Sequence, residues 1–387
     1  MDFRILNTNF APIGLLDKYE SIIWNVRFKE AGEFELYTPV ANHLIDILKI
    51  GNYLFCDEFY NQSTNRAILM IIETIEITTD SENGDTLKVT GRDLKSILDR
   101  RIIWGQKTFK ANTSIDTIIQ TILNENIINP QDWSKTYQDG DGGSRTVSIQ
   151  GSKRKINNFV YESIGYTFPS IEKDVEYNCN NIYDTVLEIC DAFNIGFEVL
   201  FDFNSNRFVF RLKNTRNRTT SSSNPLVFSP GFENLKNSSY IESSVTEKNS
   251  ALISGSGDEY NIMYNTIGND LSGLYRREMH INPSDVTVAG DEDEIGDVHG
   301  NGTYLDMLYS KALEELSKNE YTQKYSGEAE TLQGYKYMTD YDLGDICEII
   351  NEWGIGAQVI ITEVVSSIST SNISTIPTFT SLEEGGD

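Results

Sequence analysis

Two apolar, β-branched runs near the end of the chain predict a β-hairpin. The first run covers residues 343–350 and the second residues 358–365, and the connection between them contains Gly354 and Gly356. The triplet Leu343-Gly344-Asp345 predicts a tight entry into the first strand, because Gly and Asp favour turns. A small barrel can close on such a pair of strands.

The N-terminal third repeats this layout. Residues 50–56 again read apolar, Gly, polar and then an apolar run, and residues 66–75 match the second strand of the C-terminal pair. We therefore predict two related barrel cores in one chain.

The first 104 residues contain further strand and helix patterns. Strands are expected near 3–6, 13–16, 21–28 and 33–37, with polar and apolar residues alternating in the last of these. Asn42 is a candidate cap for a short helix at 43–49, and Asn83-Gly84 predicts a hairpin turn before a return strand at 87–91. Residues 92–104 show helical spacing, and their four basic side chains alternate with Asp93 and Asp99, which predicts a solvated helix face with internal ion pairs.

The middle of the chain predicts an inserted α+β module. Amphipathic helices are expected at 112–128 and 181–193, followed by a strand, turn and strand at 197–203 and 207–212. Between the helices, residues 129–149 are rich in Pro, Asp, Gly and Ser, which predicts an exposed loop. Its acidic residues are not interpreted as a calcium site, because the closing Glu of a calcium loop is absent. Residues 214–225 predict a flexible linker with solvated arginines.

The last third predicts short strands near 226–228, 240–245, 249–255 and 276–281 and a helix at 303–318. The acidic cluster Asp291 to Glu294 with Asp297 is interpreted as a solvated loop. Residues 366–387 are Ser/Thr-rich and then acidic, which predicts a tether or an arm that grips a neighbour.

Composition narrows the function classes. The 387 residues exceed what one hydrophobic core serves, and the formal charge of −26 argues against specific nucleic-acid binding, because an acidic surface repels phosphates. The four cysteines lack CxxC spacing and are interpreted as buried free thiols, so no metal site and no cofactor is proposed. No apolar run reaches the ~20 residues of a membrane helix, so we expect that the chain does not insert into a membrane. No secretory leader is recognised, and we therefore expect the chain to be made in the cytoplasm.

Catalytic motifs are absent from the sequence. The three histidines lie outside any recognisable nucleophile motif, and GxSxG, HExxH and Walker patterns do not occur. We therefore predict that the chain is not an enzyme. A carboxylate pair of a polysaccharide hydrolase needs no motif, and a cleft flanked by Trp104, Trp133 or Trp353 would support that alternative. A host receptor-binding module, with residues 129–150 as its surface, is a further alternative.

Four short motifs, taken together, carry a family resemblance. They are Val89-Thr90-Gly91-Arg92-Asp93-Leu94, Leu98-Asp99-Arg100-Arg101-Ile102-Ile103, Leu343-Gly344-Asp345 and Ile361-Thr362-Glu363-Val364. In this order and spacing the chain resembles the Gp37-like tail proteins of siphoviruses over residues 1–370. That family belongs with phage baseplate hub proteins, whose structural domain is shared with the N-terminal part of tail-associated lysins.

The resemblance implies an α+β, mainly β fold with two related small β-barrel domains and inserted α+β domains. The expected domains are a first hub barrel at 1–108, the inserted module at 109–225, a second hub barrel with an inserted helix at 226–370 and a flexible acidic tail at 371–387. It also implies a homotrimer that forms a ring in the virion tail, with a distal tail or tail tube protein above, a spike, fibre or tip protein below, and DNA or tape measure protein in the lumen. Its expected interface lies on the strands near 50–75 and 343–365. The candidate interface residues are Tyr53, Phe55, Ile68, Met70, Ile346, Glu348, Val359 and Ile361.

Overall fold

The computed structural model describes residues 2–80, 84–138, 143–255, 264–282, 301–319, 321–329, 335–354, 356–369 and 373–382. Contacts divide the chain into two compact units, one made of Met1–Ser238 with Ser326–Asp387 and the other of Ser239–Tyr325. The fold is mostly β, as predicted. The four domain boundaries expected from the sequence stay a prediction.

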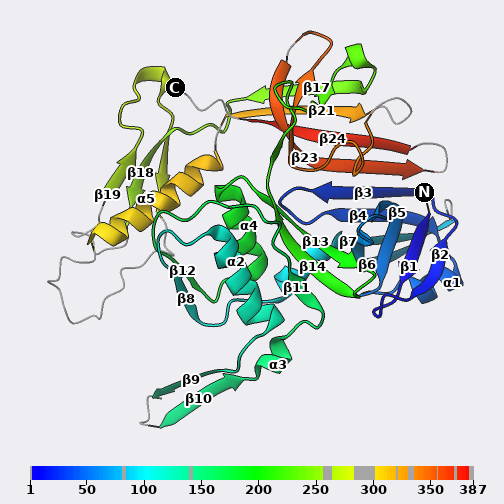
Figure 1. The fold of residues 1–387 in the computed structure, drawn as a ribbon, viewed down its shortest axis with the longest axis horizontal. Helices are drawn as coiled ribbons and strands as arrows, with labels where there is room; N and C mark the ends of the chain where they lie inside the picture. Colours follow the sequence, from blue (N-terminus) through cyan, green and yellow to red (C-terminus); the bar gives the residue numbers. More distant parts are fainter. Residues whose placement is uncertain are drawn as a thin grey trace. The chain divides into compact units, whose positions relative to one another are not determined.

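The strands of residues 3–93 form a first strand set (Figure 1). Within it the antiparallel neighbours run in the order β3, β4, β7, β6 and β5, and two further N-terminal strands extend it, β1 on β5 and β2 on β1. Its strands are β1 (Phe3–Leu6), β2 (Pro12–Leu16), β3 (Ser21–Arg27), β4 (Glu33–Pro39), β5 (Tyr53–Asn61), β6 (Arg66–Asp80) and β7 (Gly84–Asp93). The short helix α1 (Asn42–Ile47) connects β4 to β5, and its N-cap is Ala41, so the predicted cap at Asn42 is wrong by one residue.

Five later strands form a second strand set with the same order of pairing. They are β17 (Leu235–Ser243), β21 (Thr322–Ala329), β22 (Asp345–Ile350), β23 (Gly356–Ser369) and β24 (Ile373–Ser381). In this set β17 pairs with β21, β21 with β24, β24 with β23, and β23 with β22. Chain order and pairing thus match β3, β4, β5, β6 and β7 one for one.

The repeat extends to single hydrogen bonds. Gly51 and Gly344 precede β5 and β22 with φ of 87° and 86°, a region in which glycine is unstrained. Gly51 donates its N–H to Ile72 O and Gly344 to Ile361 O, both at 2.8 Å. A register shift follows in each partner strand, after Ile72 in β6 and after Ile361 in β23. The two predicted hairpins are confirmed, whereas closure of each strand set into a barrel stays a prediction.

The helices and the strand pair predicted for the middle of the chain are confirmed. The elements of this module are β8 (Gln106–Phe109), α2 (Ile115–Leu123) with a π-helical turn at Asn124–Ile128, β11 (Phe159–Tyr161), β12 (Val175–Asn178), α4 (Ile182–Ala192), β13 (Gly196–Asp202) and β14 (Arg207–Lys213). Ile118, Val186 and Phe210 belong to one hydrophobic core that also contains Leu69 of β6. The module therefore shares its core with the first strand set.

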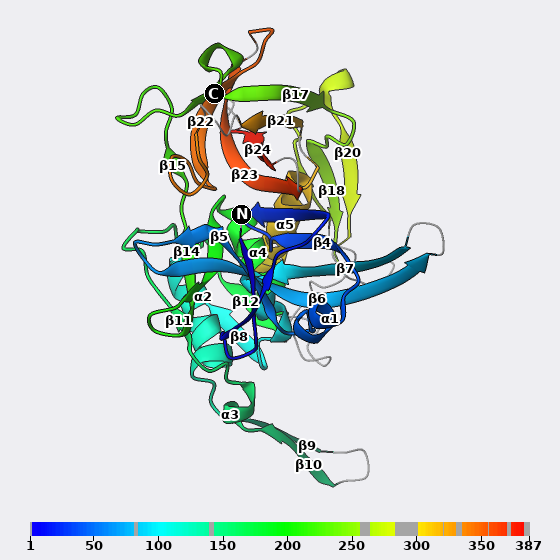
Figure 2. The ribbon, with the colours of Figure 1, turned by 90° about the vertical axis from the view of Figure 1, so that its right-hand side faces the viewer.

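The predicted exposed loop is a projecting β-hairpin. Strands β9 (Trp133–Gln138) and β10 (Ser144–Ile149) pair along six residues, and every side chain in them is exposed or half-buried. The hairpin extends away from α2 and α4, beyond the short helix α3 (Gly151–Arg154) (Figure 2).

The smaller unit has its own core. Strands β18 (Ser250–Ser254), β19 (Tyr264–Ile267) and β20 (Glu278–Ile281) form a sheet, and α5 (Asn301–Ser317) packs on it through Leu308, Ala312 and Leu316. The predicted strands near 249–255 and 276–281 and the predicted helix are confirmed. The acidic cluster at 291–297 lies outside the described residues.

Three expectations are corrected. Residues 94–100 form a 3₁₀ helix, and although Arg92 does pair with Asp99 at 3.3 Å, Lys95 and Asp93 are buried instead of solvated. The tail expected to be flexible contains β24, which pairs with β23 along most of its length. Of the four cysteines, Cys56, Cys190 and Cys347 are buried as expected, but Cys179 is exposed.

Candidate functional site

The two strand sets are joined edge to edge by β3 and β23. These strands pair antiparallel over seven residue pairs, from Arg27 opposite Glu363 to Ser21 opposite Ser369. Phe28 extends the ladder by donating its N–H to Thr362 O at 2.8 Å. One continuous sheet therefore passes from the first strand set to the second.

Charged side chains reinforce this junction. Arg27 Nε donates to Glu363 Oε1 at 2.9 Å, and Asn25 Nδ2 donates to the same oxygen at 2.5 Å. Arg27 also donates to Glu33 at 2.5 Å. Both members of the Arg27–Glu363 pair are about three-quarters buried, so solvent screens the pair less than an exposed one.

The ring of Phe28 fills the space over two glycines. A Cβ on Gly344 would lie 2.4 Å from Phe28 Cε2, and a Cβ on Gly196 would meet the same atom at 2.4 Å. Phe28 O also accepts the N–H of Phe197 at 3.3 Å. The module strand β13, the turn after β3 and the entry to β22 thus meet at one aromatic side chain.

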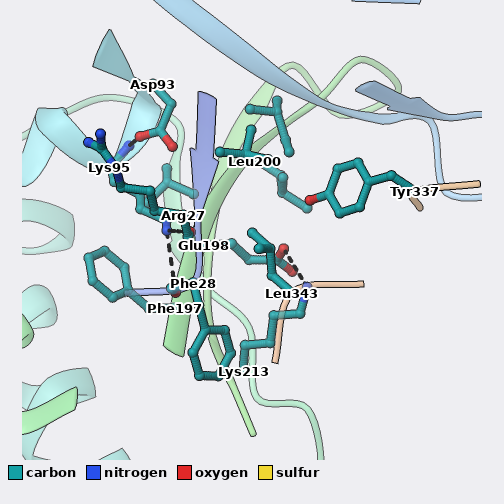
Figure 3. Close-up of a pocket in the computed structure, with 13 residues that line it drawn as sticks. Arg27, Phe28, Asp93, Lys95, Phe197, Glu198, Leu200, Lys213, Tyr337 and Leu343 are labelled. Carbon is teal, nitrogen blue, oxygen red and sulfur yellow. Dashed lines mark hydrogen bonds and ion pairs between the residues drawn. The ribbon is translucent and has the colours of Figure 1, made fainter. Parts of the chain in front are cut away.

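Lys95 holds the turn after β3 from inside the protein (Figure 3). Its Nζ donates to Arg27 O at 2.6 Å, Glu30 O at 2.9 Å and Phe28 O at 3.4 Å, and it lies 5.0 Å from the centre of the Phe197 ring. Burial lowers the pKa of Lys95, because desolvation disfavours the charged ammonium.

Asp93 holds the same turn from its other end, and we call Lys95 and Asp93 together the clamp. Its carboxylate accepts the N–H of Gly32 and the N–H of Lys95, each at 2.9 Å. Burial raises the pKa of Asp93, while Lys95 and these hydrogen bonds act in the opposite direction. The turn at residues 28–32 is therefore fixed from both of its ends.

A small cavity lies beside this clamp. Its volume is about 20 Å³, room for about one water molecule, and Lys95, Glu198, Lys213 and Tyr337 are among the residues that line it. Within the described ranges, no group of three or more His, Cys, Asp or Glu side chains is placed to hold a metal ion. A cavity of this size has no space for an organic substrate.

A second buried charge anchors the linker to the second strand set. Asp345, which is fully buried, accepts from Arg216 Nε at 2.7 Å and Arg218 Nη1 at 3.4 Å. The short strands β15 (Arg216–Asn217) and β16 (Val227–Phe228) run parallel to β22. The prediction of a flexible linker is therefore wrong at these positions. The prediction of solvated arginines is wrong at Arg218 (13% exposed), whereas the Arg216 side chain is 53% exposed.

The predicted interface residues divide into two groups. Four are in the protein core: Phe55 (5% exposed) and Met70, Val359 and Ile361 (all 0%). The other four are half-buried: Tyr53, Ile68, Ile346 and Glu348. Tyr53 stacks on Phe10, Ile68 lines the cavity, and Glu348 accepts a hydrogen bond from Thr220 Oγ1 at 2.7 Å. Only the second group can contribute to a docking surface without unfolding, and their role there stays a proposal.

The aromatic and histidine candidates are also placed. Trp104 and Trp133 contact each other edge to face with their ring centres 5.4 Å apart, and Arg154 lies over the Trp104 ring. These contacts fix the base of the β9–β10 hairpin. Trp353 is 86% exposed. His280 Nε2 and Ser254 Oγ are 2.8 Å apart, a contact that the sequence did not predict, yet among the described residues no carboxylate contacts this imidazole to orient it.

Sequence reasoning missed the buried charges of the junction. Lys95, Asp345 and Glu363 are spread over residues 95–363, and each needs a partner from a distant segment. The available signal was a charged residue next to an apolar run, as at Leu94-Lys95-Ser96-Ile97-Leu98 and Asp345-Ile346-Cys347. In the described residues no helix is both long and apolar enough to cross a membrane.

Comparisons with known proteins agree with this architecture. The model of the siphovirus ReqiPepy6 Gp37-like protein family matches residues 2–379. A tail protein from Neisseria meningitidis MC58 is similar in fold, with a TM-score of 0.54, 11% identity and coverage of 99% of this chain and 97% of that chain. The 43 kDa tail protein of prophage MuSo2 from Shewanella oneidensis has a TM-score of 0.56, 11% identity and 98% coverage of both chains. No curated protein matches the sequence.

Proposed function

Because the chain belongs to the siphovirus ReqiPepy6 Gp37-like family, we propose that it is a structural baseplate hub protein of a phage or phage-like tail. In this role it forms a homotrimeric ring between a sixfold tail tube and a threefold tip. It acts as a scaffold and not as an enzyme. It is assembled in the host cytoplasm and resides in the virion.

The observation that carries the proposal is the repeated strand set. Five strands in the same chain order make the same pairings twice, each with a left-handed glycine at its entry. In a ring of three copies, the strand sets present six similar surfaces, whereas the whole chain occurs only three times. A chain with two matching halves therefore suits a joint between sixfold and threefold assemblies.

Rigidity at the junction supports the same role. Three features fix the position of one strand set relative to the other: the β3–β23 ladder, the Arg27–Glu363 pair and the Lys95 clamp. A ring that must match the spacing of a tube needs its two halves fixed, because a flexible hinge would let the contacts lose register. Two related sheets closed into barrels would be the building blocks of this ring.

The charge of the chain supports a passive channel. With a formal charge of −26, a lumen lined by the protein repels DNA and does not retain it. DNA or tape measure protein would then pass through the ring without specific contacts. The proposed neighbours are a distal tail or tail tube protein above and a spike, fibre or tip protein below.

Native mass spectrometry of the purified full-length chain tests this proposal. We expect a three-chain species, and we expect it to bind the neighbouring tube protein when the two are mixed. A stable single-chain species at every concentration, with no association with the tube protein, would refute the hub.

The projecting hairpin favours one alternative, a host receptor-binding role. The β9–β10 hairpin exposes Tyr137 (43%) and Val147 (45%) at its surface. Replacing residues 134–148 by a short Gly/Ser connection tests this role, with assembly measured by native mass spectrometry and adsorption by phage binding to host cells. Loss of adsorption with normal assembly would support receptor binding, and normal adsorption would exclude it for this hairpin.

A further inference from the structure

Within the described residues, the first strand set leaves uncovered a strand edge that has a partner strand in the second set. In β23, the edge that pairs with β22 through Ile360 continues past the bulge, and β3 occupies it along Glu363–Ser369. In β6, the corresponding edge pairs with β5 through Ile71, and Asn52 accepts the N–H of Ile72. Beyond Ile72, the described part of the chain supplies no partner strand on that edge of β6.

The register defines which residues are left uncovered. Thr74 of β6 follows the bulge and faces Thr90 of β7, as Glu363 follows the bulge in β23 and faces Thr378 of β24. Counting onward, Thr74–Asp80 corresponds residue for residue to Glu363–Ser369. A length of β6 equal to the seven-pair ladder between β3 and β23 is therefore available for pairing.

Side-chain exposure shows what the missing strand would cover. Val364 and Ser366 of β23 are 0% and 2% exposed, and they lie opposite Val26 and Trp24 of β3. The matching positions in β6 are Ile75, which is half-buried, and Ile77, which is 49% exposed. Ile77 lies opposite Leu87, which is fully buried, so an apolar surface continues from the core to an open edge.

We propose that Thr74–Asp80 of β6 is a docking edge for β17 of a second copy of this chain. Within the chain, β3 of the first strand set pairs with β23 of the second. The counterpart of β3 in the second strand set is β17, and the counterpart of β23 in the first is β6. The equivalent contact between copies therefore joins β17 of one copy to β6 of the next.

The chemistry of the edge fits strand addition. The segment Thr-Ile-Glu-Ile-Thr-Thr is rich in β-branched residues and contains neither Lys nor Pro, the residues that commonly protect an exposed edge. Main-chain hydrogen bonds supply the affinity in this mode of association, and Ile75 and Ile77 supply apolar contact. The contact is heterologous, so repetition produces a closed ring when the rotation between copies permits closure.

This inference rests on the proposed hub function and identifies its inter-subunit contact. Amide hydrogen exchange of the full chain, compared between assembled and dissociated protein, tests it directly. In the assembly we expect exchange to slow about tenfold or more at Thr74–Asp80 and at Leu235–Ser243. Exchange at Ser21–Arg27 should not change, because that strand is already paired within the chain.

A matched pair of variants provides the second measurement. Ile77→Lys places a charge on the proposed edge and should weaken association roughly tenfold or more, whereas Ile45→Lys, at a comparably exposed isoleucine of α1, should not. A three-copy assembly with unchanged exchange at β6 would overturn the docking edge and leave the hub intact. Normal assembly of Ile77→Lys, or slowed exchange at β6 without slowed exchange at β17, would also overturn it. Failure to assemble at all would refute both the docking edge and the hub.

Discussion

Replacing Lys95 by Met tests whether the buried clamp stabilises the junction. The thioether chain retains most of the lysine volume but removes the ammonium that donates to Arg27 O, Phe28 O and Glu30 O. A buried acceptor without a donor costs about 1–3 kcal/mol, and two of the three contacts are short enough to count fully. The variant also removes the Lys95 charge, which stabilises the buried Asp93 carboxylate by acting against the burial that raises its pKa.

The expected net loss is about 2–5 kcal/mol in the free energy of unfolding, because two carbonyl acceptors lose their donor at about 1–3 kcal/mol each and the relief of lysine desolvation offsets part of this loss. Urea unfolding followed by circular dichroism measures the change. Lys107→Met is the matched control, because Lys107 also pairs with a carboxylate (Glu125, 2.6 Å) and lies near a Phe ring, but with both side chains exposed by about a third or more.

The control should lose only about 0–1 kcal/mol, as expected for a surface pair. A double variant, Lys95→Met with Asp93→Asn, should be less destabilised than the sum of the single variants, because the orphaned carboxylate is removed. If Lys95→Met loses less than about 1 kcal/mol, the clamp does not stabilise the turn and the reasoning fails.

Three further predictions concern single positions. Gly344→Ala should lower the melting temperature more than Gly354→Ala, because both have positive φ but a Cβ meets another group within 4 Å only at Gly344; equal melting temperatures would contradict this. In the native protein one thiol per chain, that of Cys179, should react with a thiol reagent and all four should react in denaturant; a second fast native thiol would show that the buried cysteines are accessible. The Arg66 guanidinium lowers the pKa of Glu162, so the stability that this pair contributes to the fold is present above about pH 4.5 and is lost as pH falls through the folded pKa of Glu162. Glu162→Gln should therefore reduce the loss of stability at acid pH measured by urea unfolding, and an unchanged pH profile would refute this prediction.

The sequence by itself determined the local structure. Alternation of apolar residues and the Gly-containing turns identified the two hairpins, and helical spacing identified α2, α4 and α5. The likeness between residues 50–75 and 343–365 also predicted the repeat, because the left-handed glycine and the following strand are encoded by neighbouring residues. These features depend on interactions within a few tens of residues.

Only the tertiary structure decided how the halves are joined. Arg27 and Glu363 are 336 positions apart, and nothing in either local pattern states that β3 completes the sheet of β23. The same holds for Lys95, whose neighbours in sequence predicted a solvated helix face, and for β24, whose polar composition predicted a tether. Burial and edge pairing depend on which distant segment arrives at a strand, and a one-dimensional pattern contains no information about that partner.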